Sequence, residues 1–206
     1  RADEVVTVLP YMGYGRQDEA FEPGEPVSAR AMARAISTGT DRVMTVNPHE
    51  ASIADFFEVP CATVDAAGHL ADPLPGLSDP LFLSPDAGAI DLAETVRDAY
   101  GGGAVDYFEK VRHSDTDVEI RPNDASTAGR DVVLVDDIVA TGSTMSTAID
   151  QLSAPERVFV TCVHPMLAAN ARTKLATAGV EAVYGTDTIE RAVSAVSAAP
   201  AIADEL

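Results

Sequence analysis

The sequence predicts an α/β protein with two domains, each built on a mostly parallel β-sheet, and the first domain is expected to be incomplete. Three observations support this prediction. The chain has 206 residues, enough for one large or two small α/β domains. Short apolar runs alternate with helical patterns along the chain, which is typical of parallel strands joined by crossover helices. A stretch containing Gly and Pro, residues 66–80, separates two such series and marks a domain boundary.

The first domain is predicted to span residues 1–66. Apolar runs predict strands at Glu4–Leu9, Arg42–Val46 and Ala62–Asp65. Periodic apolar positions predict helices at Ser28–Ser37 and Glu50–Phe57. The first strand is expected at the centre of a sheet, yet no earlier strand flanks it. We therefore expect either that the chain is an N-terminal truncation or that another chain covers this edge.

The second domain is predicted to span residues 67–190. A C-terminal strand and helix, residues 191–206, could pack back on the first domain. The predicted strands are Leu81–Ser84, Ala104–Val111, Val118–Ile120, Val132–Val135, Arg157–Val163, Val183–Gly185 and Ala192–Val196. The predicted helices are Gly88–Tyr100, Met145–Leu152, Ala168–Ala178 and a terminal helix near Ala199–Leu206.

The composition is strongly acidic, with a formal net charge of −19 and only two lysines, Lys110 and Lys174. Such a charge repels nucleic acid and anionic lipid, so neither is expected as a partner. No apolar stretch approaches the roughly 18 residues of a membrane span, and no signal-peptide pattern opens the chain, so we expect a cytoplasmic protein. An Asp- and Glu-rich, Lys-poor surface suits a high-salt cytoplasm, which indicates a halophilic source. Any phosphate site here needs local Arg, Lys, Mg²⁺ or helix dipoles.

The run from Asp131 to Thr144 carries the clearest chemical signal. An apolar stretch ends in two adjacent carboxylates, Asp136 and Asp137, which is typical of a buried parallel strand that leads to a ligand crevice. The loop that follows contains Ala140, Thr141, Gly142, Ser143 and Thr144. Its N–H and hydroxyl donors suit a phosphate, and the carboxylates suit sugar hydroxyls. The run therefore predicts a ribose 5-phosphate pocket; the alternative is a Ser/Thr-rich turn that caps a helix.

Polar residues that could bind a nucleotide follow two strands of the first domain. Arg16 can form paired hydrogen bonds to a phosphate, and Gln17 and Asp18 can contact a base or a ribose. The alternative is an ordinary loop with Arg16 in a surface ion pair. His49 follows the strand Arg42–Val46, and on its own it is more readily explained as a hydrogen-bonded turn histidine.

Two further motifs lie in the second domain. Asp86 follows the strand Leu81–Ser84, and a carboxylate at that end of a strand suits a hydrated Mg²⁺, although it could also cap the next helix. Lys110 and Arg112 lie two residues apart and share a face if the segment is extended. The alternative is a solvated edge strand in which a lysine prevents edge-to-edge pairing.

Together these motifs resemble the ribose-phosphate diphosphokinases (PRPP synthetases), over almost the whole chain from Val5 to Leu206. The loop after Asp137 resembles the 5-phosphoribosyl-diphosphate loop, which phosphoribosyltransferases share. The segment Pro10–Ala29 is similar to P-Y-x-x-Y-x-R-Q-D … P-G-E-P-[IV]-S-A, which ordinary phosphoribosyltransferases lack. Residues 84–88 match S-P-D-x-G, residues 110–112 match K-x-R, and residues 186–189 match T-[ND]-T-[IL]. The sequence departs from the family pattern at Asn47-Pro48 and at Pro165, which replaces a glycine.

The resemblance implies two phosphoribosyltransferase-like domains and transfer of the diphosphoryl group of ATP to O1 of ribose 5-phosphate, giving PRPP and AMP. It implies Mg²⁺ as cofactor, held by His49 and Asp86, and catalytic roles for Lys110 and Arg112. The implied ATP-binding residues are Arg16, Gln17, Asp18 and His49. The implied ribose-5-phosphate ligands are Asp136, Asp137, Ala140, Thr141, Gly142, Ser143 and Thr144. Family members carry a further N-terminal segment and assemble through it, so a homo-oligomer is expected where that segment is present.

Three alternatives remain open at this point. A nucleobase phosphoribosyltransferase would consume PRPP rather than make it. A non-catalytic regulatory homologue would assemble with active subunits. A plain nucleotide-binding module would bind ATP without needing ribose 5-phosphate.

Overall fold

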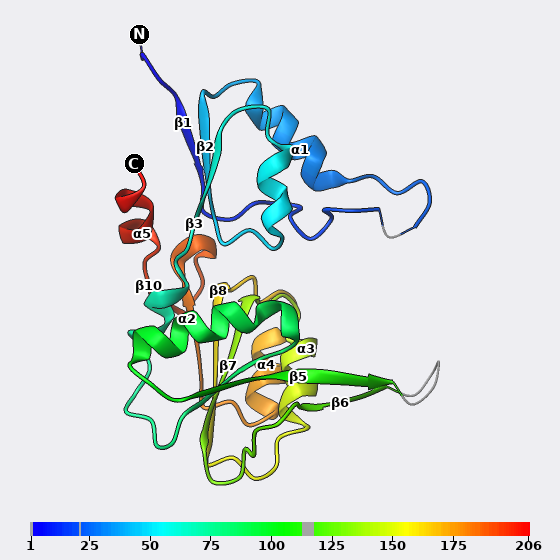
Figure 1. The fold of residues 1–206 in the computed structure, drawn as a ribbon, viewed down its shortest axis with the longest axis vertical. Helices are drawn as coiled ribbons and strands as arrows, with labels where there is room; N and C mark the ends of the chain where they lie inside the picture. The colour runs from blue at the N-terminus through cyan, green and yellow to red at the C-terminus, as the bar shows by residue number, and fades with distance from the viewer. Residues whose placement is uncertain (1, 21, 113–117) are drawn as a thin grey trace. The chain divides into compact units, whose positions relative to one another are not determined.

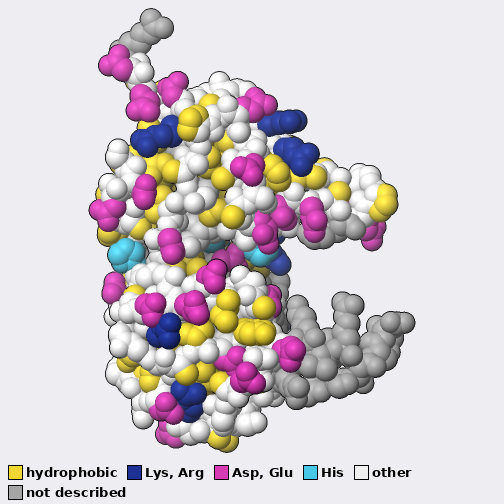
Figure 2. Space-filling model, viewed as in Figure 1, with side chains coloured by type: hydrophobic (Ala, Val, Ile, Leu, Met, Phe, Trp, Pro, Cys, Tyr) yellow, Lys and Arg dark blue, Asp and Glu magenta, His cyan; other side chains and the backbone are white. Residues whose placement is uncertain are grey.

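A computed structural model describes residues 2–20, 22–112 and 118–206, and the side chains of residues 110–121 lie outside this description. The contacts divide the chain into two units (Figure 1). The N-terminal unit consists of Arg1–Ala66 and Ala198–Leu206, and the C-terminal unit consists of Ala67–Ser197. Figure 2 shows acidic side chains spread over the visible face of the molecule, as the composition leads one to expect.

The N-terminal unit contains a parallel sheet with the strand order β1-β2-β3. Its strands are β1 (Val6–Leu9), β2 (Arg42–Val46) and β3 (Cys61–Val64). Its helices are α1 (Ser28–Ser37), the 3₁₀ helix η1 (Ala51–Phe56) and α5 (Ala199–Asp204). Apolar residues of β2, α1 and η1 form its core, among them Ala33, Val43 and Ile53.

The C-terminal unit contains a sheet with the order β10-β9-β8-β7-β4-β5-β6, in which all pairs are parallel except β5 with β6. Its strands are β4 (Leu81–Ser84), β5 (Ala104–Arg112), β6 (Val118–Pro122), β7 (Asp131–Ile138), β8 (Arg157–His164), β9 (Ala182–Thr186) and β10 (Ser194–Val196). Its helices are η2 (Ala67–Ala71), η3 (Ala87–Ala89), α2 (Ile90–Tyr100), α3 (Ser143–Ile149), α4 (Ala171–Thr177) and η4 (Asp187–Ile189). The predicted α/β class with mostly parallel sheets is confirmed.

Helices cover both faces of this sheet, which explains why its strands are continuous apolar runs. Leu83 and Leu134 point to one face and share a buried cluster with Leu175 of α4. Phe82 points to the opposite face, where its ring centroid lies 5.7 Å from that of Tyr100 in α2. No helix among the described residues is long and apolar enough to cross a membrane.

Several boundaries differ from the predicted ones for local reasons. Strand β7 continues beyond Val135 to Ile138, so both carboxylates of the acidic pair belong to the strand. Helix α3 begins at Ser143 rather than Met145. Helix α4 begins at Ala171 rather than Ala168 because the backbone just before it turns with φ of +52° at Ala169. The C-terminal segment 191–206 is divided between the units, since β10 belongs to the larger sheet and α5 to the N-terminal unit.

Candidate active site

The order of the strands places a topological switch point between β4 and β7. From β4 the chain proceeds to β5 on one side, and later returns to β7 on the other side before continuing to β8. In open α/β sheets, ligands bind outside the carboxyl ends of the strands at such a point. Asp86 directly follows β4, and Asp136 and Asp137 lie at the end of β7. The switch point thus brings Asp86 close to the adjacent pair Asp136 and Asp137, from which it is distant in the sequence.

Backbone amides fix the direction of these carboxylates. Asp136 Oδ1 accepts a hydrogen bond of 3.0 Å from the amide of Asp137, and Asp137 Oδ1 accepts one of 2.8 Å from Ile138. Asp86 Oδ1 accepts one of 3.0 Å from Gly88, so Asp86 caps η3. The capping alternative for Asp86 is therefore observed, and among the described residues its second carboxylate oxygen accepts no hydrogen bond.

The electrostatic environment of Asp136 is unfavourable to its own charge. Burial raises the pKa of Asp136 well above its usual value, and the nearby charges of Asp137 and Asp86 raise it further. Cys162 pairs with Asp136 across β7 and β8, and its thiol pKa is raised by burial and by the Asp136 charge. A ligand that donates hydroxyl protons to these carboxylates, or a cation, would relieve the repulsion.

The loop after β7 is anchored by the segment that joins β8 to α4. Val139 donates a backbone hydrogen bond of 3.3 Å to His164 O and accepts one of 2.9 Å from Leu167, while Ala140 O accepts one of 2.8 Å from Ala168. Gly142 has φ of +70°, and a Cβ atom there would lie 3.3 Å from Ala171 O. The positive φ favours glycine here, and the absence of a side chain lets α4 approach closely.

Hydroxyl groups dominate the exposed side of this loop. Thr141, Ser143 and Thr144 are exposed. Thr141 Oγ1 donates a hydrogen bond of 3.2 Å to Ser143 Oγ, and Lys174 Nζ donates one of 2.8 Å to the same oxygen. Sequence analysis did not assign Lys174 to the site, although its being one of only two lysines was a signal. A loop of hydroxyl and N–H donors beside an ammonium group is suited to a phosphate.

The strands β5 and β6 extend beyond the carboxyl edge of the sheet as an antiparallel pair. Ser84, the last residue of β4, pairs with Tyr107, and β5 continues to Arg112. Lys110 pairs with Ile120 and Arg112 with Val118. The backbone of Lys110 and Arg112 therefore lies beyond the carboxyl end of β4, the same strand end that Asp86 follows. Their side chains lie outside the described part of the structure.

The turns after β8 and β9 are joined to each other. His164 Nδ1 lies 2.8 Å from Thr188 Oγ1, which donates a hydrogen bond of 2.8 Å to Val163 O. A Cβ atom at Gly185 would lie only 2.8 Å from Pro165 Cγ. Pro165, where the family pattern has glycine, is thus accommodated because the facing residue has no side chain.

The predicted nucleotide-binding residues follow strands β1 and β2 of the N-terminal unit. Residues 12–17, which follow β1, form a turn that is closed by backbone hydrogen bonds from Gly15 N to Met12 O at 3.1 Å and from Gln17 N to Tyr14 O at 2.9 Å. Arg16 and Gln17 are exposed, Asp18 is half-buried, and His49 is exposed after β2.

The departure from the family pattern at Asn47 has a structural role. Its side-chain amide donates a hydrogen bond of 2.8 Å to Asp65 Oδ1, and its Oδ1 accepts one of 2.8 Å from Ala66 N. These bonds join the ends of β2 and β3. Asn47 has φ of +34°, a conformation that asparagine adopts more readily than most residues.

The donor set is compatible with Mg²⁺ rather than with a metal held entirely by protein. Among the described residues, no group of three or more His, Cys, Asp or Glu side chains is arranged to hold a metal ion. Mg²⁺ usually keeps several waters and binds one or two carboxylates together with substrate phosphates. Asp86, close enough to Asp136 to raise its pKa, provides such a carboxylate.

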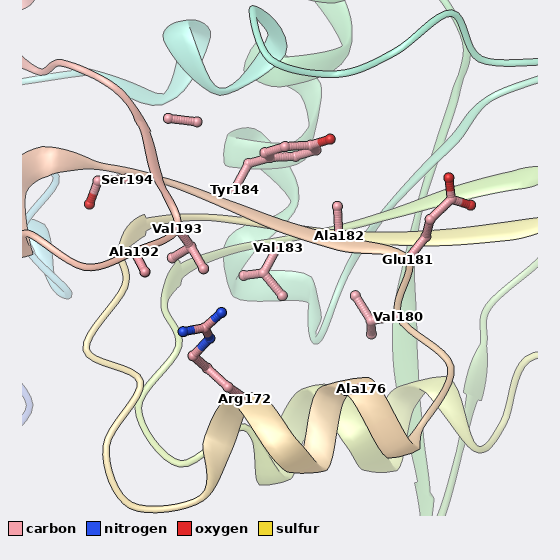
Figure 3. Close-up of a pocket in the computed structure, with 11 residues that line it drawn as sticks. Arg172, Ala176, Val180, Glu181, Ala182, Val183, Tyr184, Ala192, Val193 and Ser194 are labelled. Atoms are coloured by element: carbon pink, nitrogen blue, oxygen red, sulfur yellow. The ribbon is translucent and has the colours of Figure 1, made fainter.

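A separate cavity of about 400 Å³ lies between α4 and the strands β9 and β10 (Figure 3). Figure 3 shows the Arg172 side chain reaching from α4 into it, toward Val193. Among the residues that line this cavity none belongs to the loop after β7 or to the carboxylate cluster. Arg172 and Ala176 of α4 line the cavity, whereas Ala171 and Lys174 contact the loop, so the two features lie on different faces of α4.

Known proteins resemble the chain in both of its units. Residues 66–194 match the phosphoribosyl transferase domain, and residues 1–39 match the N-terminal domain of ribose phosphate pyrophosphokinase. The ribose-phosphate pyrophosphokinase of Halobacterium salinarum is 70% identical over 206 residues, which cover 100% of this chain and 73% of that protein. The chain belongs to the ribose-phosphate pyrophosphokinase family. The ribose-phosphate pyrophosphokinase of Methanosarcina mazei is 44% identical over 209 residues, covering 100% of this chain and 70% of that protein.

The structural comparison agrees with the family. The crystal structure of phosphoribosylpyrophosphate synthetase from Mycobacterium smegmatis matches with a TM-score of 0.81 at 29% identity, covering 99% of this chain and 70% of that chain. The family predicted from the motifs is thereby confirmed, and the high identity to a Halobacterium protein fits the halophilic type that the composition indicated.

Proposed function

We propose that this protein transfers the β,γ-diphosphoryl group of ATP to O1 of ribose 5-phosphate, giving PRPP and AMP. Membership of the ribose-phosphate pyrophosphokinase family supports this reaction. One structural observation supports the proposed position of the ribose-phosphate site. Asp136 and Asp137 lead directly into an anchored loop of hydroxyl residues at the switch point of the larger sheet.

Ribose 5-phosphate would bind with its two ends on different chemical groups. The 5-phosphate accepts hydrogen bonds from the loop, which consists of Ala140, Thr141, Gly142, Ser143 and Thr144. Asp136 and Asp137 accept hydrogen bonds from the sugar hydroxyls. This arrangement also offsets the two causes that disfavour the Asp136 charge in the free site, first its burial and then the repulsion from Asp137 and Asp86.

ATP would be bound and oriented by the N-terminal unit. Arg16 donates to the phosphates, while Gln17, Asp18 and His49 contact the nucleotide. His49 and Asp86 are the residues that would hold Mg²⁺, which when bound neutralises phosphate charge. Asp86 lies at the carboxyl end of β4, a position that suits a hydrated Mg²⁺.

The transfer step needs positioning and charge neutralisation more than covalent help from the protein. The 1-hydroxyl oxygen attacks the β-phosphorus in line, an O–P bond forms, and the bond from the β-phosphorus to the bridging oxygen of AMP breaks. AMP leaves with the electron pair, and the hydroxyl proton is released. Lys110 and Arg112, on the extended β5–β6 pair, would stabilise the negative charge that spreads over the phosphoryl oxygens.

The finer expectations belong to the same proposal. We place the enzyme in the cytoplasm and in nucleotide biosynthesis, and we expect it to assemble with copies of itself. The acidic composition gives the protein a negative electrostatic potential, which repels nucleic acid. It supports an enzyme that acts on small molecules and has no nucleic-acid partner.

The reaction is tested by an assay of AMP release with ATP, ribose 5-phosphate and Mg²⁺. We expect one AMP for each PRPP formed and no AMP when ribose 5-phosphate is omitted. Release of diphosphate from PRPP in the presence of a nucleobase would instead identify a phosphoribosyltransferase. Binding of both substrates without AMP release would identify a non-catalytic homologue.

A further inference from the structure

Lys174 contacts the loop that we assign to the phosphate of ribose 5-phosphate. Its Nζ donates a hydrogen bond of 2.8 Å to Ser143 Oγ, which also accepts one of 3.2 Å from Thr141 Oγ1. A hydroxyl group has two acceptor lone pairs and one proton to donate. Because both lone pairs of Ser143 Oγ are occupied, its proton remains available to an oxygen of a bound ligand.

The position of Lys174 follows from the packing of α4 against the loop. Ala171, the first residue of α4, lies so close to Gly142 that a Cβ atom there would be 3.3 Å from Ala171 O. Lys174 is three residues further along α4 and therefore lies on the same face of the helix. The close approach of α4 to Gly142 thus also brings the ammonium group to Ser143.

The charge of Lys174 matters because its surroundings are acidic. The chain has a formal net charge of −19, and the carboxylates of Asp86, Asp136 and Asp137 make the electrostatic potential beside the loop more negative. A phosphate dianion entering this region needs a nearby cation. Among the side chains that the structure describes, no carboxylate forms an ion pair with Lys174, whose ammonium group donates to Ser143 Oγ instead.

We infer that Lys174 is a positioning residue for the phosphate end of ribose 5-phosphate, a role that rests on the proposed function. Its ammonium group turns the Ser143 hydroxyl proton toward the phosphate and supplies positive charge beside it. A purely structural alternative exists, because a lysine in the last turn of a helix also stabilises the helix by its interaction with the helix dipole. The two roles predict different kinetic effects.

The test compares Lys174→Met, Lys174→Arg and Arg172→Met in the purified protein. Arg172→Met is the matched control, because it removes one positive charge from the same helix but on the side of the separate cavity. For Lys174→Met we expect the KM for ribose 5-phosphate to rise about 10-fold, the loss typical of one hydrogen bond involving a charged group. We expect kcat and the KM for ATP to stay within about twofold, Lys174→Arg to restore the KM to within about threefold, and Arg172→Met to resemble the wild type.

Titration calorimetry separates failure of this inference from failure of the proposed function. Ribose 5-phosphate is titrated in the presence of α,β-methylene-ATP, in which the bond that would break is blocked. Weaker binding by Lys174→Met supports the role of Lys174 even if the wild type releases no AMP, a result that would overturn only the reaction. Unchanged KM and affinity in Lys174→Met, or an equal change in Arg172→Met, would overturn the role of Lys174 while AMP release by the wild type still stands.

Discussion

The carboxylates at the two ends of the strands in the seven-stranded sheet lie in opposite electrostatic environments. We call the side with the amino ends of the parallel strands the amino edge, and the side with their carboxyl ends the carboxyl edge. At the amino edge, Asp131 begins β7 and accepts hydrogen bonds from Arg157 Nε at 2.9 Å and Nη2 at 2.6 Å, and from Ser78 N at 2.6 Å. The hydrogen bond from Arg157 holds the pKa of Asp131 below its usual value. At the carboxyl edge of the same strand, burial and then the charge of Asp137 raise the pKa of Asp136.

We propose that this contrast separates residues that stabilise the fold from residues that bind a ligand. A carboxylate whose charge is satisfied within the protein contributes to the stability of the native state. A carboxylate held beside other carboxylates lowers that stability and is explained by a ligand that completes its contacts. Under the proposed function, the amino edge stabilises the fold, and binding of ribose 5-phosphate relieves the unfavourable environment of the carboxylates at the carboxyl edge.

The largest effect is expected beyond the carboxyl edge, at Lys110. Lys110→Ala should lower kcat by about 10³ or more, because a single cation that stabilises the transition state of phosphoryl transfer contributes on that order. The KM for ribose 5-phosphate should change little, since the loop after β7 is intact. The AMP-release assay measures both parameters, and Glu109→Gln on the same strand is the control. An equal loss in turnover and in ribose-phosphate binding would refute the assignment.

The next largest effect is expected at the amino edge. Asp131→Asn should lower the free energy of unfolding by about 2 kcal/mol, because the buried carboxylate loses its charge and one of the two oxygens that accept from Arg157 and Ser78 N. The KM for ribose 5-phosphate should not change in the folded fraction. Urea unfolding together with steady-state kinetics checks both statements. A rise in KM would show that the two edges are not functionally separate.

Asp136→Asn, at the carboxyl edge, should weaken the binding of ribose 5-phosphate and stabilise the ligand-free protein. The KM for ribose 5-phosphate should rise about 10-fold, since a hydrogen bond from a sugar hydroxyl to a carboxylate is replaced by a weaker one to an amide. The ligand-free protein should melt at a higher temperature than the wild type at neutral pH, because an amide avoids the burial of a charge and its repulsion with Asp137 and Asp86. A variant that is both less stable and fully active would contradict the distinction.

The smallest effect is a dependence of stability on pH that has opposite signs at the two edges. Because the pKa of Asp131 is lowered by folding, its contribution to stability is present at neutral pH and is lost as the pH falls below about 4. Because the pKa of Asp136 is raised, folding retains its proton, and its cost to stability grows as the pH rises from about 4. Melting temperatures of the two variants, relative to the wild type, should therefore diverge in opposite directions as the pH is raised.

Much of the fold follows from the sequence because the parallel strands are buried on both faces. Strands Arg42–Val46 and Leu81–Ser84 and the helix Ser28–Ser37 have the predicted bounds. The starts of α3 and α4 depend instead on backbone conformations at Gly142 and Ala169. Nothing in an alanine indicates a positive φ, so the start of α4 could not be predicted from the residue type.

The acidic pair and its loop were predictable because they are contiguous in the sequence. The closeness of Asp86 to Asp136 was not, because β5 and β6 come between β4 and β7 in the chain and the strand order alone makes β4 and β7 neighbours. Lys174 is 31 residues from Ser143 and reaches it only through the packing of α4. The scarcity of lysine in this chain makes Lys174 a notable residue, but it does not show where in the fold Lys174 lies.

Direct binding of ribose 5-phosphate to the Asp131→Asn and Asp136→Asn variants decides whether the carboxyl edge of the sheet is the substrate site. The titration is performed with α,β-methylene-ATP present, so that no transfer takes place. Affinity should match the wild type for Asp131→Asn and fall about 10-fold for Asp136→Asn. Unaltered affinity in Asp136→Asn would show that the sugar binds elsewhere.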